Sequence, residues 1–139
     1  MKVHFLKAQS QKALSVAQEF ESIETVPADD ADVFVVFGGD GFMLKMIRAY
    51  QHYHKPFYGI NCGHVGFLMN AIDQVEPNDL INVLKNTCHS TLPVLEFQLE
   101  TIDHMTVEDY AINEVAFMRQ NAMASNISVY IKSKQRIVC

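Results

Sequence analysis

The sequence lacks a long apolar run, a paired-cysteine motif and a cluster of basic residues. No stretch approaches the roughly 20 apolar residues that span a bilayer, and residues 1–12 are too charged and too short in apolar length for a secretory signal. A formal net charge of −5 argues against a nucleic-acid surface. We therefore expect a cytoplasmic protein that engages neither a membrane nor nucleic acid.

Three cysteines without CxxC spacing predict buried free thiols in a reducing compartment: Cys62, Cys88 and Cys139.

The first 92 residues alternate between strand-like apolar runs and helical apolar spacing. The run Val33 to Phe37 is continuous, as expected for a strand that is buried on both faces of a parallel sheet. This alternation predicts an α/β domain over residues 1–92, Rossmann-like, with a parallel sheet and flanking helices. The predicted segments are 3–6, 10–20, 23–26, 33–37, 42–50, 57–60 and 77–84.

Details within these segments support the assignment. Ser10 can cap the helix that follows it, and Pro77 suits a helix start. The expected apolar face of the first helix is Ala13, Leu14, Ala17 and Phe20. Residues Met43, Met46 and Met69 are expected to fill core space.

The pattern changes after residue 92. Residues 91–102, 108–118 and 126–133 read as strands, with no convincing helix between them. We expect residues 93–139 to form the first strands of an all-β domain. Because the strand-like pattern of 135–139 runs into the end of the sequence, we also expect the chain to be part of a longer protein.

The sequence FVVFGGDGFML, Phe34 to Leu44, places glycines between a buried strand and a helix. Free N–H groups and the helix dipole favour a phosphate at such a point, so Gly38, Gly39 and Gly41 form a candidate phosphate loop. Neither G-x-G-x-x-G nor a Walker sequence is present. Asp40 within the loop could hold Mg²⁺ against a phosphate or accept the proton of an attacking hydroxyl. The alternative is that Asp40 caps the helix.

Two further motifs follow in the chain. They are NCGHVGFL at residues 61–68 and NEV at residues 113–115. With GGDG, in this order and spacing, they resemble the bacterial NAD kinase family over essentially the whole chain. GGDG alone also occurs in diacylglycerol-type lipid kinases and sphingosine kinases, whereas N-x-G-x-x-G-F combined with a later Asn-Glu is far more specific.

The resemblance implies ATP-dependent phosphorylation of the 2′-hydroxyl of the adenosine ribose of NAD, with a divalent metal ion such as Mg²⁺. Asp40 then resembles the general base, and Gly41 lets the dinucleotide approach the backbone. Lys45 occupies a position that is often basic and near phosphates. Phe67 resembles the aromatic residue of the adenine pocket, and Asn113 with Glu114 resembles the pair that contacts adenosine. The family also implies a homodimer or homotetramer for the full-length protein. Residues 93–139 would then belong to a β-rich NAD-binding domain.

For several residues a purely structural role, or no specific role, stays open. Lys45 could be a solvated helix lysine, and Phe67 a core residue. His52 and His54 have no third ligand nearby, so they are weak metal candidates, and His64 could be an ordinary loop residue.

The sequence departs from the family in two places. Phe42 stands where the family often has Thr or Ser, and the Gly/Ser/Thr-rich segment ending in Ala-Tyr is absent. A chain ending at Cys139 is therefore expected to be inactive alone. The alternative functions are a lipid kinase of the diacylglycerol type and a non-catalytic dinucleotide-binding module.

Overall fold

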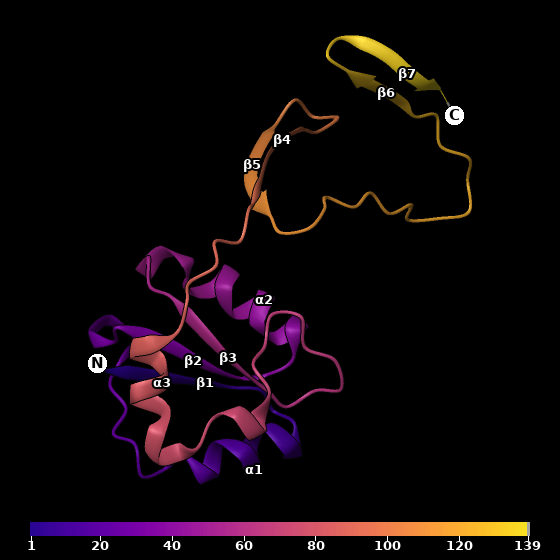
Figure 1. Ribbon diagram of the computed structural model, residues 1–139. Helices are drawn as coiled ribbons and strands as arrows, with labels where there is room; N and C mark the ends of the chain where they lie inside the picture. The colour runs from indigo at the N-terminus through magenta and orange to yellow at the C-terminus, as the bar shows by residue number, and fades with distance from the viewer. Residues whose placement is uncertain (139) are drawn as a thin grey trace. The chain divides into compact units, whose positions relative to one another are not determined.

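The computed structural model describes residues 1–138 and consists of two compact units, the first being Met1–Thr91 and the second beginning at Leu92 (Figure 1). The first unit has a parallel sheet flanked by helices, and the second has only antiparallel strands. This confirms an α/β part followed by a β part.

None of the helices in the described residues is long and apolar enough to cross a membrane. The first unit contains β1 (Val3–Lys7), α1 (Gln11–Glu19), β2 (Val33–Gly38), α2 (Asp40–Tyr50), β3 (Phe57–Asn61) and α3 (Leu80–Asn86), with 3₁₀ turns at Ala28–Asp30, Gln51–Tyr53, Ile72–Gln74 and Pro77–Asp79.

Strand β2 is the centre of the first unit. The sheet order is β1-β2-β3, with Val3 opposite Val33 and Phe34 opposite Phe57. Every residue of β2 is buried, as the continuous apolar run predicted. A parallel strand with no exposed face needs a layer of helices on each side.

Alternate residues of β2 build two cores, one on each face of the sheet. Val35 packs with α1 and α3, whereas Val36 packs against α2 and the 3₁₀ turn after it. In Figure 1, α1 and α3 accordingly lie on the side of the sheet opposite α2. On the α2 side, Met43 is buried and Met46 and Met69 are partly buried, so the prediction of core methionines is confirmed.

Helix α1 begins as predicted. The Ser10 Oγ accepts a hydrogen bond of 3.2 Å from the backbone N–H of Ala13. The expected apolar face was wrong at one position, because Leu14 is 44% exposed and Val16 is buried in its place. Ala13, Val16, Ala17 and Phe20 follow the three- and four-residue spacing of one helical stripe, and Leu14 lies about 100° away from Ala13.

The strand expected at residues 23–26 is reduced to one parallel bridge, between Thr25 and Val3. Pro27 follows at once and has no N–H to extend the ladder. The bridge still fixes the topology. From β1 the chain continues through α1 to Thr25, which pairs with the edge of β1 that faces away from β2. Helix α2 instead connects β2 to β3, on the opposite side of β1.

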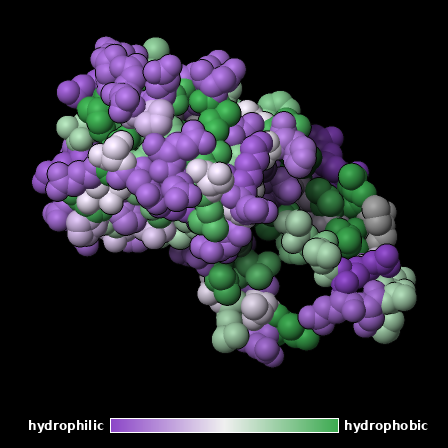
Figure 2. Space-filling view, turned by 90° about the horizontal axis from the view of Figure 1, so that it is seen from below, coloured by the Kyte–Doolittle hydropathy of each residue, from purple (hydrophilic) through white to green (hydrophobic). Residues whose placement is uncertain are grey.

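The second unit contains β4 (Leu95–Glu100), β5 (Thr106–Ala111), β6 (Ser128–Ile131) and β7 (Lys134–Val138). They form two separate hairpins, β4 with β5 and β6 with β7. No side chain from 92 to 137 is buried, and hydrophobic residues lie at the surface of this unit (Figure 2). The strand expected over 108–118 was wrong beyond Ala111, because Asn113 has a φ of 74° and turns the chain.

The cysteines differ from the expectation in one case. Cys62 is buried, but Cys88 is exposed, and both are free thiols. Cys88 lies in the irregular segment between α3 and β4, where its side chain is exposed. The expectation for Cys139 lies outside the described residues.

Matched valine substitutions test the central position of β2. Val36 is fully buried, and Val65 is 65% exposed in the same unit. Val36→Ala should lower the free energy of unfolding by about 2–3 kcal/mol, because two methyl groups are lost and a cavity remains. Val65→Ala should change it by less than about 0.5 kcal/mol. Urea unfolding of the 139-residue chain, followed by far-UV circular dichroism, measures both; equal effects would contradict the assigned core.

Candidate functional site

The candidate site lies where parallel strands end at the same edge of the sheet. Helix α1 leads from β1 to one side, and helix α2 leads from β2 to the other, so the crossovers diverge between β1 and β2. Ligands of open α/β sheets bind outside the carboxyl ends of the strands at such a divergence. The first glycine loop (residues 38–41) leaves β2 at this edge, and the second glycine loop (residues 61–68) leaves β3.

Asp40 does not cap helix α2. Gly39 is the N-cap, with an extended φ of −123° and no side-chain hydrogen bond, and Asp40 is the first residue of the helix. The capping interpretation is therefore wrong. The partly buried carboxylate accepts two hydrogen bonds from the second glycine loop instead. The Phe67 N–H donates to Oδ2 at 3.0 Å, and the Leu68 N–H donates to Oδ1 at 2.9 Å.

The second glycine loop is folded around Asn61. The Asn61 Oδ1 accepts a hydrogen bond of 2.8 Å from the Gly63 N–H. A Cβ added at Gly66 would lie 2.6 Å from the Asn61 Nδ2, so the amide packs directly on that glycine. This explains the N-x-G-x-x-G spacing. At its base the loop is joined to the sheet, because Cys62 N–H donates to Gly38 O at 2.6 Å and Asn70 N–H donates to Gly59 O at 2.8 Å.

The three glycines of the first loop have different surroundings. A Cβ added at Gly38 would meet Phe42, at 2.7 Å from its Cδ1, whereas one at Gly39 would be 3.9 Å from the Gly63 Cα. At Gly41 there is nothing within 4 Å. Gly38 is thus needed for packing of the chain itself. Gly39 has room for a Cβ at ordinary contact distance, and Gly41 has the most open surroundings of the three, as a ligand that touches the backbone requires.

Several side chains of the second loop point into solvent. Phe67 is 90% exposed, Val65 and Leu68 are exposed, and so is His64. The interpretation of Phe67 as a core residue is therefore wrong. Its backbone is held by Asp40, while its ring is available for contact with another molecule.

Two lysines bring positive charge to the helices of this edge. Lys45 is exposed on α2 and makes no hydrogen bond or ion pair within the described part of the chain. Lys12, which the sequence analysis missed, reaches from the first turn of α1 to within 3.4 Å of Gly63 O. The sequence feature that could have indicated Lys12 is its position in the helix that follows β1.

Burial raises the pKa of the neighbouring Cys62 thiol, and Lys12 and the Gly38 backbone act in the opposite direction. The thiol therefore stays neutral and is no candidate nucleophile.

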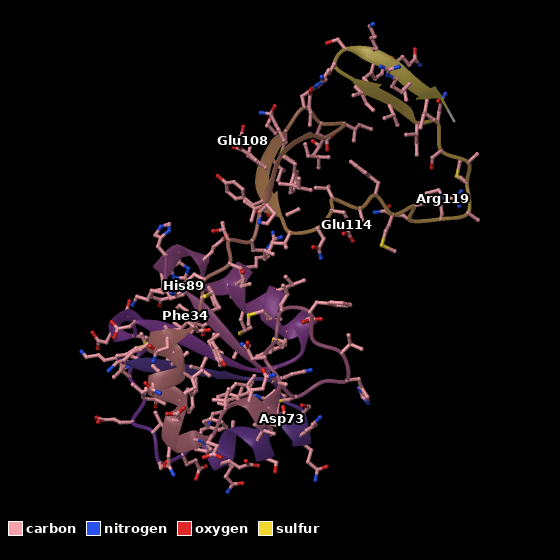
Figure 3. The ribbon with its side chains drawn as sticks, in the orientation of Figure 1. Phe34, Asp73, His89, Glu108, Glu114 and Arg119 are labelled. Carbon is pink, nitrogen blue, oxygen red and sulfur yellow. The ribbon has the colours of Figure 1, made fainter. Side chains whose placement is uncertain are left out.

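Asn113 and Glu114 belong to the second unit. They lie in the segment between β5 and β6, where Figure 3 labels Glu114. The positive φ of Asn113 is one that asparagine tolerates better than most residues, and it allows the Glu114 N–H to donate to Ile112 O at 3.1 Å. Both side chains are exposed.

The histidine pair gives no metal geometry. The His52 ring lies 4.2 Å from the Tyr53 ring, and His54 adopts a left-handed φ of 53°. Among residues 1–138, no three His, Cys, Asp or Glu side chains are grouped as ligands for a metal ion.

Alanine substitutions separate the two kinds of loop glycine. Gly38→Ala should lower the free energy of unfolding by about 1–3 kcal/mol, because the new Cβ collides with Phe42. Gly41→Ala should leave it unchanged or raise it by up to about 1 kcal/mol, since the site is open and helical. Urea denaturation midpoints measure the difference. A neutral Gly38→Ala would mean that Phe42 can move aside.

Comparison with known proteins identifies relatives of this sequence. The sequence profile described as the ATP-NAD kinase N-terminal domain matches residues 2–92. The NAD kinase of Rickettsia bellii is 36% identical over 137 residues, which cover 98% of this chain and 52% of the relative. The NAD kinase of Brucella suis is 37% identical over 143 residues, covering 99% and 54%, and that of Xylella fastidiosa is 34% identical over 137 residues, covering 98% and 51%.

The chain spans about half the length of the curated relatives that it matches. The profile covers the entire sheet of the first unit, both glycine loops and Asp40. The alignments with these relatives cover 98–99% of the chain, so they include the hairpins of the second unit as well. The chain belongs to the NAD kinase family.

Proposed function

We propose that this chain supplies the phosphate loop and the catalytic carboxylate of an NAD kinase, which transfers a phosphoryl group from ATP to the adenosine ribose 2′-hydroxyl of NAD. The observation that carries the proposal is the position of Asp40. It lies at the diverging edge of the sheet, beside Gly41, where a ligand can approach the backbone. The comparisons favour neither a lipid kinase nor a non-catalytic module.

In this proposal Asp40 accepts the proton of the ribose hydroxyl as the hydroxyl attacks the phosphorus. A carboxylate offers about four acceptor positions, and two are occupied by the Phe67 and Leu68 N–H groups. The others remain for the hydroxyl. The first N–H groups of α2 face the phosphates, which the helix dipole favours.

The remaining predicted residues take binding roles. Lys12 and Lys45 supply positive charge for phosphate oxygens, and the exposed ring of Phe67 contacts adenine. Asn113 and Glu114, exposed in the second unit, hydrogen-bond the adenosine. Amide and carboxylate groups suit the hydroxyls and ring nitrogens of a nucleoside.

A divalent metal ion fits this set of residues in one way. Mg²⁺ is commonly held by one or two carboxylates together with substrate phosphates, and it keeps several waters. The Asp40 carboxylate has about two acceptor positions beyond its bonds to Phe67 and Leu68, so one could face the ribose hydroxyl while the other, with the phosphates, could hold the ion. The ion would neutralise charge on the phosphates during transfer.

We extend the proposal to assembly and location. Exposed apolar residues and open strand edges in the second unit favour a homodimer or homotetramer, with Ile102, Phe117 and Met118 each at least 80% exposed. The free thiols Cys62 and Cys88 favour a reducing cytoplasm.

Replacing Asp40 tests the proposed chemistry. In a chimera that joins residues 1–139 to the remaining half of the Brucella suis relative, Asp40→Asn should lower the rate of NADP formation by about 10²–10⁴-fold, because the proton acceptor is lost. Asp73→Asn, at an exposed position of the first unit (Figure 3), is the matched control and should keep the parental rate. An Asp40→Asn rate close to that of the parent would remove Asp40 from the chemistry.

The open space at Gly41 gives a second test. Gly41→Ala should weaken NAD binding to the same chimera at least about tenfold, because the methyl group occupies space that the dinucleotide needs, while stability is kept. Calorimetric titration with NAD measures this effect. Binding without any NADP formation would favour the non-catalytic module, and phosphorylation of diacylglycerol in place of NAD would favour the lipid kinase.

A further inference from the structure

The carboxylate of Asp40 bridges the first turn of α2 and the tip of the second glycine loop. Its two oxygens accept hydrogen bonds from two consecutive N–H groups, those of Phe67 and Leu68. We propose that Asp40 is also the positioning residue of this loop, and that it sets where the Phe67 ring lies relative to the proton acceptor. This inference rests on the proposed function for its meaning in catalysis, but the positioning itself does not require it.

The tip of the loop has few other restraints. Its base is joined to the sheet by the Cys62–Gly38 and Asn70–Gly59 backbone bonds, and Asn61 accepts a bond from Gly63 and packs on Gly66. The side chains of His64, Val65, Phe67 and Leu68 are exposed, so burial of their apolar surface does not order them. Within the described residues, the bonds to Asp40 are the hydrogen bonds that hold Phe67 and Leu68.

The partner of these bonds is itself rigidly placed. Asp40 follows the fully buried strand β2 and starts an 11-residue helix. Hydrogen bonds to a charged group contribute more to stability than hydrogen bonds between neutral groups. The two bonds to Asp40 therefore fix Phe67 and Leu68 to the β2–α2 junction, in a loop that Asn61 otherwise restrains at Gly63 and Gly66.

The positioning role is compatible with catalysis. Both N–H groups can stay bound while the ribose hydroxyl uses another acceptor position of the carboxylate. The ribose hydroxyl and the adenine belong to one nucleoside. One carboxylate therefore contacts the ribose directly and fixes the aromatic ring that contacts the base, so selection of an adenosine unit and proton transfer share a single side chain.

The usual substitution cannot separate these two roles. In Asp40→Asn one oxygen becomes an NH₂ donor, which faces a backbone N–H instead of accepting from it. Both the proton acceptor and half of the loop restraint are lost together. A separation requires removal of an N–H while Asp40 stays intact.

Backbone esters provide that separation. Incorporating the α-hydroxy analogue of leucine at position 68 removes the N–H that donates to Asp40 Oδ1 and keeps the side chain. The α-hydroxy analogue of valine at position 65 is the matched control, since the Val65 N–H makes no hydrogen bond among the described residues. Hydrogen exchange of residues 61–70 in the 139-residue chain then reports the order of the loop without any ligand.

The ester at position 68 should speed exchange of the loop amides at least about tenfold relative to the ester at position 65. In the chimera, it should raise the Kd for NAD about tenfold and lower the rate at saturating NAD by less than about threefold, because the carboxylate remains. Unchanged exchange and unchanged Kd would overturn the positioning role and leave the proposed function standing. Faster exchange in a chimera whose parent form binds no NAD would keep the positioning role and remove the proposed function.

Discussion

The burial of β2 on both faces constrains the rest of the first unit. All six residues of this strand are buried, and both of its edges are hydrogen-bonded to other strands. Such a strand can exist only with helices on each side, which the α1 and α2 crossovers provide. No side chain of β2 is therefore available to bind a ligand. The first polar side chain after the strand is that of Asp40, and its backbone is fixed because it closely follows the buried strand.

Local features of the first unit were predictable from sequence because their causes are local. A continuous apolar run predicts a buried strand at Val33 to Phe37, and Ser10 caps α1 through a bond to a residue three positions away. Leu14 was misplaced because apolar character alone does not choose between neighbouring helix positions. Thr25 forms one bridge instead of a strand because Pro27 interrupts the ladder. In both cases the local sequence allows more than one arrangement, and the tertiary structure decides which one forms.

The two glycine loops were recognisable from the sequence, but the contacts that they make were not. Glycines and an aspartate after a buried strand indicate a ligand loop, and the N-x-G-x-x-G spacing is explained by the Asn61 amide. No local pattern could reveal that Asp40 binds N–H groups 27 and 28 residues away. In the second unit, alternation found the strands but not the turn at Asn113, which requires a positive φ. Two hairpins without a common core are marginal alone, so their exposed apolar residues need another surface.

An aspartate in a phosphate loop presents an electrostatic problem, because its charge repels the phosphate. The contacts of Asp40 reduce this problem. Two N–H dipoles point at its oxygens and offset part of the charge, and the positive end of α2 adds to them. The hydrogen bonds also mean that Asp40 has a structural reason to be where it is, so its presence alone does not argue for catalysis. The argument for catalysis comes from its unused acceptor positions beside Gly41, where the backbone is open to a ligand. A residue with only a structural role would not need that open space, whereas a proton acceptor for a bound hydroxyl does.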